Sequence, residues 1–153
     1  MSAFFLDTSA LVKRYVDEEE GSAWMRQLAR PSSGHLIYLA WITGPETMSA
    51  LIRRQRRSDL TAQELAAALA QFRSEWERSY RRLDVSHVLI RRAMSLVERH
   101  GLRGYDSVQL AAGIEASALE RARGPSATFV SSDAALNAAA HSEGLSVEDP
   151  AAH

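Results

Sequence analysis

Short apolar runs and segments of helical periodicity alternate along the chain. The runs that predict strands are residues 3–6, 35–41, 83–85, 127–131 and 145–147. Between them apolar residues recur at every third or fourth position, which predicts helices over residues 8–16, 18–28, 43 into the run RRQRRSDL, 61–83, 86–97, 105–119 and 134–141. This alternation indicates an α/β domain with a mainly parallel sheet covered by helices on both faces. In such sheets the functional crevice lies beyond the carboxyl ends of the strands.

Residues with known preferences for helix ends support several of these boundaries. Thr61 and Glu64 form a capping-box pattern, in which each side chain accepts a free backbone N–H of the other residue. Thr8 or Ser9 is expected to cap the first helix. An apolar stripe follows Thr61, made up of Leu65, Leu69, Phe72, Trp76, Tyr80 and Leu83. We expect this stripe to pack in the core, and its aromatic end could also contact a second subunit.

The length of 153 residues suits one domain with a substantial core. We expect a single domain over residues 1–149 and a short tail over 150–153, with disorder only in the last residues, EDPAAH. The apolar run at residues 3–6 ends at Asp7, and no uninterrupted apolar segment reaches the roughly 18 residues of a membrane span. We therefore expect a cytoplasmic protein without a signal peptide.

The absence of cysteine excludes disulfides, thiol nucleophiles and zinc sites built on cysteine. The five histidines show no spacing typical of metal ligands, so we interpret them as surface or capping residues. Any metal in this protein must therefore be held by oxygen or imidazole ligands.

The net charge of −1 gives no overall basic field that would attract nucleic acid. The cations are nevertheless unusual, because Lys13 is the one lysine among 18 lysine and arginine residues. The arginines cluster at positions 53–57, 81–82 and 91–92. These clusters are either solvated helix faces or sites at which planar guanidinium groups bind phosphate oxygens or an acidic partner.

Four acidic residues share one kind of position, after an apolar or strand-like run and at the start of a predicted helix. They are Asp7 after AFFL, Glu46 after LIYLAWIT, Asp106 after GLRGY and Asp133 after ATFVSS. Each has an alternative explanation as a helix cap, because carboxylates accept free N–H groups there. For Glu46 the alternative is specific, since Thr43 and Glu46 fit a capping box.

Taken together, the four acids predict a metal site. Four carboxylates in one crevice repel one another unless a cation neutralises them or some of them bind protons. A site built from carboxylates alone suits a hard divalent cation, and Mg²⁺ commonly binds through a few carboxylates and a substrate phosphate. The sequence therefore predicts Mg²⁺ or Mn²⁺ acting on a phosphate ester.

Four strings carry a resemblance to a known family. They are FFLDTSALVKRY, PETMSALIRR, LRGYDSVQLAAGIEA and FVSSDAALNAAAHSEGL. In order and spacing they resemble the four acidic motifs of PIN-domain nucleases, most closely the VapC-type toxins of bacterial toxin–antitoxin pairs. The similarity extends over residues 3–149. The sequence departs from the family at Pro45, where an apolar or small residue is usual, and in an extra loop at ALERARGPSA.

The resemblance implies a three-layer α/β/α sandwich and a metal-dependent endoribonuclease, in which metal-activated water cleaves RNA phosphodiester bonds. The acidic quartet would be Asp7, Glu46, Asp106 and Asp133, which would bind the cation and act in catalysis. The side chains that would orient the carboxylates or water are Thr8, Ser9, Ser131 and Asn137. The implied partners are RNA, a VapB-like antitoxin that covers the crevice, and a second copy of the chain in a homodimer.

Two other functions remain open. The first is a PIN-like scaffold of weak or no activity that binds RNA or a partner protein without cutting, since Pro45 could displace Glu46. The second is a phosphotransfer domain with Asp7 as nucleophile. The haloacid-dehalogenase pattern requires a second aspartate two residues after the first, and this place is Ser9, which counts against phosphotransfer.

Overall fold

A parallel sheet runs through the centre of the protein. In the computed structural model, which describes residues 2–17 and 19–153, this sheet has five strands in the order β3-β2-β1-β4-β5. The strands are β1 (Ala3–Leu6), β2 (Leu36–Ala40), β3 (Tyr80–Leu83), β4 (Thr128–Val130) and β5 (Val147–Glu148). Because β1 lies between β2 and β4, its carboxyl end is within reach of segments from both halves of the chain.

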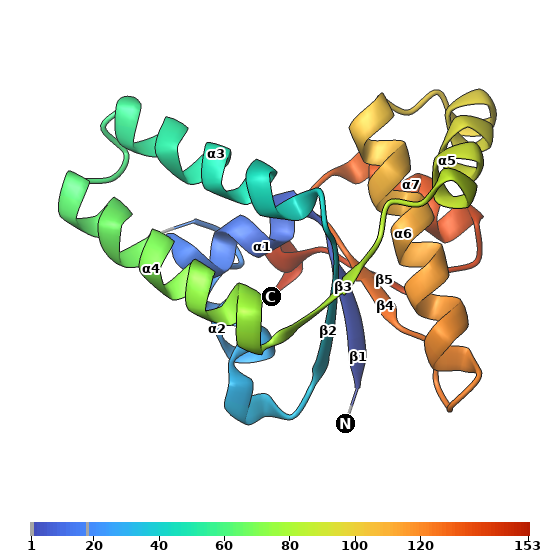
Figure 1. The fold of residues 1–153 in the computed structure, drawn as a ribbon, viewed down its shortest axis with the longest axis horizontal. Coiled ribbons are helices and arrows are strands. Elements are labelled where there is room, and N and C mark those ends of the chain that lie inside the picture. The colour runs from blue at the N-terminus through green and yellow to red at the C-terminus, as the bar shows by residue number, and fades with distance from the viewer. Residues whose placement is uncertain (1, 18) are drawn as a thin grey trace.

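Helices cover both faces of the sheet (Figure 1). One layer contains α1 (Thr8–Tyr15), α2 (Ser22–Ala29), α3 (Thr43–Arg56) and α4 (Ala62–Arg78). The other contains α5 (His87–His100), α6 (Gly104–Arg121) and α7 (Ala134–Ser142). The predicted three-layer α/β/α sandwich with a parallel sheet is confirmed. In the part of the chain that the structure describes, no helix is long and apolar enough to cross a membrane.

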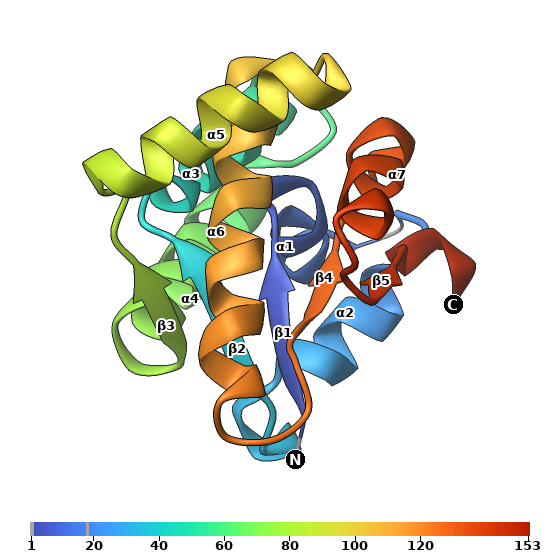
Figure 2. The same ribbon diagram turned by 90° about the vertical axis from the view of Figure 1, so that its right-hand side faces the viewer.

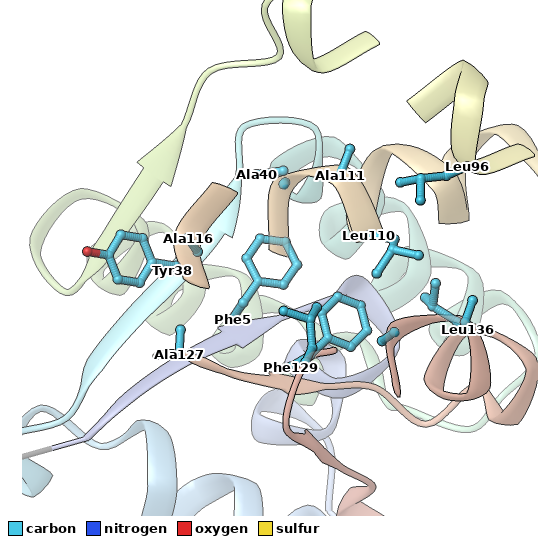
Figure 3. Close-up of a cluster of buried hydrophobic side chains, with 14 of the residues drawn as sticks. Phe5, Tyr38, Ala40, Leu96, Leu110, Ala111, Ala116, Ala127, Phe129 and Leu136 are labelled. Atoms are coloured by element: carbon cyan, nitrogen blue, oxygen red, sulfur yellow. The ribbon is translucent and has the colours of Figure 1, made fainter. Parts of the chain in front are cut away.

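Alternation along the strands divides the apolar side chains into two cores. Phe5 and Tyr38 pack under α5, α6 and α7, whereas Leu6 and Leu39 pack on the opposite face with α1 to α4. Successive side chains of a strand point to opposite faces, and both faces are covered, so the inner strands β1 and β2 are apolar throughout. Figure 3 shows the first of these cores, where Phe5 lies beside Phe129.

Gly113 lets α6 approach the sheet closely. The rings of Phe5 and Phe129 stack with their centroids 5.5 Å apart, and a Cβ atom on Gly113 would lie 2.5 Å from the ring of Phe129. Gly113→Ala should therefore lower the free energy of unfolding by about 1–3 kcal/mol through overpacking, even though alanine favours helix by about 1 kcal/mol.

Urea denaturation of the two proteins measures this difference. Gly104→Ala is the matched control, because Gly104 begins the same helix and a Cβ atom there would meet nothing within 4 Å. A Gly113→Ala variant as stable as the Gly104→Ala variant would contradict the close-packing argument.

Several boundaries differ from the sequence prediction. The helix predicted over 61–83 ends at Arg78, and Tyr80 and Leu83 belong to β3, where they pair with Ile37 and Ala40 of β2. Apolar spacing alone did not reveal this change from helix to strand. The capping box of Thr61 and Glu64 is confirmed.

The first two helices also begin elsewhere than expected. The first is capped by Asp7, whose carboxylate accepts the backbone N–H of Ala10, and not by Thr8 or Ser9. The second begins at Ser22, and the predicted start at Glu18 lies outside the described residues.

The last residues are ordered, contrary to the expected disorder. Pro150–Ala152 form a 3₁₀ turn, and Pro150 is buried against Gly21. Gly21 has φ +84°, and a Cβ atom there would lie 2.5 Å from Pro150, so both the conformation and the contact favour glycine. The ring of His153 stacks on Trp24 at 4.0 Å.

A buried polar network joins α1, α4 and β3. Arg14 Nε donates to Glu75 at 2.9 Å, a second guanidinium nitrogen also contacts this carboxylate, and Tyr15 donates to it at 2.8 Å. Tyr80 contacts the Tyr15 hydroxyl. Arg14 is 7% and Glu75 8% exposed. Burial alone would lower the pKa of Arg14, but hydrogen bonds and the charge of Glu75 outweigh burial and raise it.

Candidate active site

A pocket of about 370 Å³ is lined by residues that follow the carboxyl ends of β1, β2 and β4 and by residues at the start of α6. In Figure 2 the arrowheads of β1 and β2 point up toward this end of the sheet. The structure brings the four predicted acids together in this pocket, together with a fifth acid and three cations. The charged residues of the lining are Asp7, Glu19, Glu46, Asp106, Asp133, Lys13, Arg54 and Arg103.

Asp7 is the most buried acid of the pocket, with 4% of its surface exposed. It ends the central strand and caps α1, so that its backbone and its carboxylate are both fixed. Oδ1 accepts from Ser9 Oγ at 2.7 Å and from Ala10 N at 3.0 Å, and Oδ2 accepts from Ser131 Oγ at 2.6 Å. Contacts from α1 and from the segment after β4 thus orient the carboxylate.

Burial raises the pKa of Asp7 to about 6. The hydrogen bonds from Ser131, Ser9 and Ala10 stabilise the anion and act in the opposite direction, while the charge of Asp106 raises the pKa further. Near neutral pH the buried Asp7 anion therefore destabilises the folded protein, and a nearby cation would stabilise this anion.

Glu46 lies in the first turn of α3 and turns its side chain into the pocket. Its Oε1 accepts from Thr8 Oγ1 and from Gln109 Nε2, each at 3.1 Å. Burial raises the pKa of Glu46; these two hydrogen bonds lower it and the charge of Asp106 raises it. The carboxylate is thus held by α1 and α6 at the same time.

The alternative of a capping box at Thr43 and Glu46 is wrong. A capping box needs Thr43 to be an extended N-cap residue, but Thr43 is already the first residue of α3, and Ile42 before it has helical backbone angles (φ −62°, ψ −23°). Thr43 instead accepts a hydrogen bond from Gln109 at 3.0 Å. Pro45 is the third helical residue, where a backbone N–H has no intrahelical partner, and it therefore leaves Glu46 aimed at the pocket.

Asp106 and Asp133 are joined by an arginine. Asp106 lies in the first turn of α6, and Asp133 caps α7 through a hydrogen bond from Leu136 N at 2.9 Å. Arg103 Nε contacts Asp106 Oδ2 at 3.1 Å, and Arg103 Nη2 lies 3.7 Å from Asp133 Oδ2. The side chain of Arg103 is 84% exposed. A single guanidinium at the surface therefore offsets two of the four acids.

The remaining cations of the pocket form a second pair of contacts. Lys13 Nζ lies 3.6 Å from Glu19 Oε2, and Arg54 Nε donates to Glu19 Oε1 at 2.9 Å. Lys13 lies in α1 and Arg54 lies in α3. The single lysine and the arginine run that were noted in the sequence therefore meet at one wall of the pocket.

The donor chemistry of the pocket fits Mg²⁺ or Mn²⁺, since it offers carboxylate and hydroxyl oxygens in place of sulfur or imidazole. The raised pKa of Asp7 shows negative charge that the hydrogen bonds do not fully compensate. Across residues 2–17 and 19–153, however, no three carboxylate or imidazole side chains converge closely enough to hold one ion. The carboxylates would therefore have to move closer together to share one ion, and a ligating carboxylate can keep the hydrogen bonds that orient it.

The predicted polar residues around the acids differ in their placement. Thr8 donates to Glu46, whereas Ser9 and Ser131 donate to Asp7. Asn137 donates to the carbonyl of Ser131 at 2.8 Å and is not part of the pocket lining that the described residues form.

Gln109 and Arg103 were not among the residues predicted for the site from the sequence. Both lie three residues from Asp106, on either side of it, and this spacing places them on the same face of a helix or at its start. That spacing was the available signal. Gln109 is buried, and its Oε1 atom has no hydrogen-bond partner within the described part of the chain.

The solved structures that share this fold include chains from three bacteria. A chain of VapBC2 from Rickettsia felis, solved bound to a DNA fragment from their promoter, is 16% identical, with a TM-score of 0.59 over 96% of this chain and 98% of that chain. VapC20 from Mycobacterium tuberculosis, described as a sarcin-ricin loop cleaving toxin, is 19% identical, with a TM-score of 0.59 over 90% and 95%.

A chain of a toxin–antitoxin complex from Klebsiella pneumoniae is 15% identical, with a TM-score of 0.52 over 85% of this chain and 86% of that chain. Comparison with protein-family models gives no match, and comparison with curated proteins also gives none. At these identities the likeness concerns the arrangement of helices and strands. The protein therefore has the PIN-like α/β/α fold of these structures.

Proposed function

We propose that this protein is a metal-dependent endoribonuclease that acts in the cytoplasm as the toxin of a toxin–antitoxin pair. The observation that carries the proposal is the meeting of Asp7, Glu46, Asp106 and Asp133 in one pocket. These acids come from four separate segments, and a cap function for each explains neither their meeting nor the orientation of Glu46 by Thr8 and Gln109.

In this proposal Asp7, Asp106 and Glu46 hold Mg²⁺ or Mn²⁺, and Asp133 assists. The bound cation would supply a water of lowered pKa and offset the charge that develops on the phosphate oxygens. Ser9 and Ser131 keep the carboxylate of Asp7 in a fixed orientation. This orientation reduces the reorganisation needed when substrate binds.

The positive side chains of the pocket would bind the RNA backbone. Lys13 and Arg54 lie at one wall, where Glu19 is their present partner. Contacts to phosphate position a nucleic acid but carry no base information. We therefore expect the choice of RNA to depend on the shape of the target and on its unpaired bases.

Protein partners belong to the proposal as well. The fold is shared with chains from a toxin–antitoxin complex, which supports an antitoxin whose chain covers the pocket. We also propose a homodimer. Phe72, in the apolar stripe that follows Thr61, is buried in the core. Val88 and Met94 of α5 and Tyr105 of α6 are exposed and offer an apolar contact surface.

A scaffold that binds without cutting is the second candidate. It is favoured by the observation that no three acids of the described chain converge as ligands of one ion. The scaffold was first suggested because Pro45 could displace Glu46. This displacement does not occur, because Glu46 lines the pocket.

Cleavage of RNA with Mn²⁺ or with a chelator separates the two candidates. We expect the protein to cut single-stranded RNA with Mn²⁺, to leave 5′-phosphate ends, and to lose this activity with chelator. Asp106→Asn should slow cleavage by about 100-fold, because it removes charge from the cation site. Asp59→Asn is the matched control, since Asp59 is an exposed aspartate whose ion pair with Arg57 lies outside the pocket.

Calorimetry with Mn²⁺ completes the test. The nuclease should bind Mn²⁺ specifically and bind it more weakly after Asp106→Asn. If the unaltered protein neither binds Mn²⁺ specifically nor cleaves RNA, the proposed function is contradicted and the scaffold is favoured.

A further inference from the structure

Arg103 is placed to contact more than its present partners. It immediately precedes α6, its side chain is 84% exposed, and its guanidinium lies between the carboxylates of Asp106 and Asp133. The contacts are of unequal length, 3.1 Å to Asp106 and 3.7 Å to Asp133. Ion pairs that are this open to solvent contribute little stability. Arg103 can therefore leave both acids at small cost.

The two acids that Arg103 contacts are needed elsewhere if the proposed function holds. A divalent cation and a guanidinium are competing partners for the same carboxylates, since either neutralises them. When the cation takes Asp106 and Asp133, Arg103 loses its partners within the pocket. Its planar fork then remains at the pocket mouth, where its geometry matches the oxygens of a phosphate group.

We propose that Arg103 has two successive partners: it holds Asp106 and Asp133 until a divalent cation binds, and it then binds a backbone phosphate of the RNA. This inference rests on the proposed function and specifies how its cation and substrate are coupled. Arg103 is suited to this role by position, since Lys13 and Arg54 of the same pocket are tied to Glu19, which is outside the acidic quartet. Arg103 alone among these three cations is bound to the quartet itself.

Arg103→Ala should change two equilibria in opposite directions. The affinity for Mn²⁺, measured by calorimetry without RNA, should rise about twofold to fivefold, because the competing guanidinium is gone. The affinity for a short single-stranded RNA with phosphorothioate linkages, measured with Mn²⁺ present, should fall. The slope of log affinity against log salt concentration should become shallower by about 0.7, the value for one phosphate contact on a single strand.

Two further variants provide controls. Arg103→Lys keeps the charge but not the fork, so it should retain the salt slope of the unaltered protein while binding RNA more weakly. Arg26→Ala removes another exposed arginine, which lies on α2 outside the pocket and pairs with Asp17. This variant should change neither equilibrium. Arg103 is exposed, so its variants should fold like the original, which circular dichroism checks.

The outcomes are separable from those of the proposed function. If the unaltered protein binds Mn²⁺ and RNA but Arg103→Ala behaves like Arg26→Ala, the inference is overturned while the nuclease proposal stands. A change in only one of the two affinities also overturns the assignment of two partners. If the unaltered protein binds no Mn²⁺ specifically, the proposed function fails and the inference fails with it.

Discussion

Asp7→Asn is expected to reduce RNA cleavage by about 100- to 1000-fold and, at the same time, to stabilise the folded protein. The first effect follows from the proposed function, since Asp7 would be a ligand of the cation. The second follows from the burial of Asp7, which raises its pKa from 3.8 to about 6. A single substitution should thus separate the contribution of the carboxylate to the cleavage rate from its effect on the free energy of unfolding.

The sign of the stability effect follows from proton binding. Between pH 3.8 and about 6 the folded protein keeps a proton on Asp7 that the unfolded chain has lost. The free energy of unfolding contributed by this group therefore falls as the pH rises through this window, and stays low above it. Asparagine carries no charge, so Asp7→Asn should be more stable by about 3 kcal/mol above about pH 7.

Urea denaturation between acid and neutral pH, in buffer with chelator, measures this effect. The difference between the variant and the original protein should vanish below the unfolded pKa of 3.8 and be complete above about pH 7, once Asp7 has lost its proton in the folded protein. Asp59→Asn, at an exposed position, should follow the original protein across the range. A variant at Asp7 that is less stable at every pH would show that its hydrogen bonds to Ser9 and Ser131 outweigh the cost of burial.

Glu75→Gln should be the most destabilising of the substitutions considered, by about 3–5 kcal/mol. The substitution leaves the guanidinium of Arg14 buried without its counter-charge, and it weakens the acceptor of the Tyr15 hydroxyl. An unpaired buried charge costs more than the pair itself contributes. The double variant Arg14→Met, Glu75→Leu removes both charges and should recover most of the lost stability.

Denaturation in urea near neutral pH compares these variants. Asp17→Asn is the matched control, because it breaks the exposed pair of Asp17 and Arg26 and should change stability by less than about 0.5 kcal/mol. A Glu75→Gln variant that is as stable as Asp17→Asn would contradict the assignment of a buried, closely coupled pair. A double variant less stable than Glu75→Gln would show that packing, and not charge, dominates at this position.

Much of the fold was predictable because local signals and tertiary structure agree. The run at residues 3–6 is a strand as expected, and Ser86 and Gly101 stand at the ends of α5. The prediction failed where a helical spacing continued into a strand. Tyr80 and Leu83 continue the helical spacing of apolar residues in α4. They belong to the sheet only because they pair with β2, which is distant in the sequence.

The meeting of Asp7, Glu46 and Asp133 was predictable because these acids follow β1, β2 and β4, and parallel strands present their carboxyl ends at one edge. Asp106 follows helix α5, so the strand-like run predicted before it is wrong. The partners of the acids were not predictable. Gln109 reaches Thr8, Thr43 and Glu46 only because α1, α3 and α6 come together at this edge. The helix that starts at Thr43 resembled a capped one in sequence, but the helical angles of Ile42 are visible only in three dimensions.

The hydrogen bond between Asp7 and Ser131 joins residues 124 positions apart. During synthesis, the ribosome therefore releases Asp7 long before its partner exists. Long-range parallel pairing forms slowly compared with local helices, so the docking of β4 beside β1 is a late event. Until then Ser131 and Asp133 cannot join the other acids. If the proposed nuclease function holds, a nascent or incomplete chain cannot cut the RNA that surrounds it, because the four acids meet only in the complete sheet.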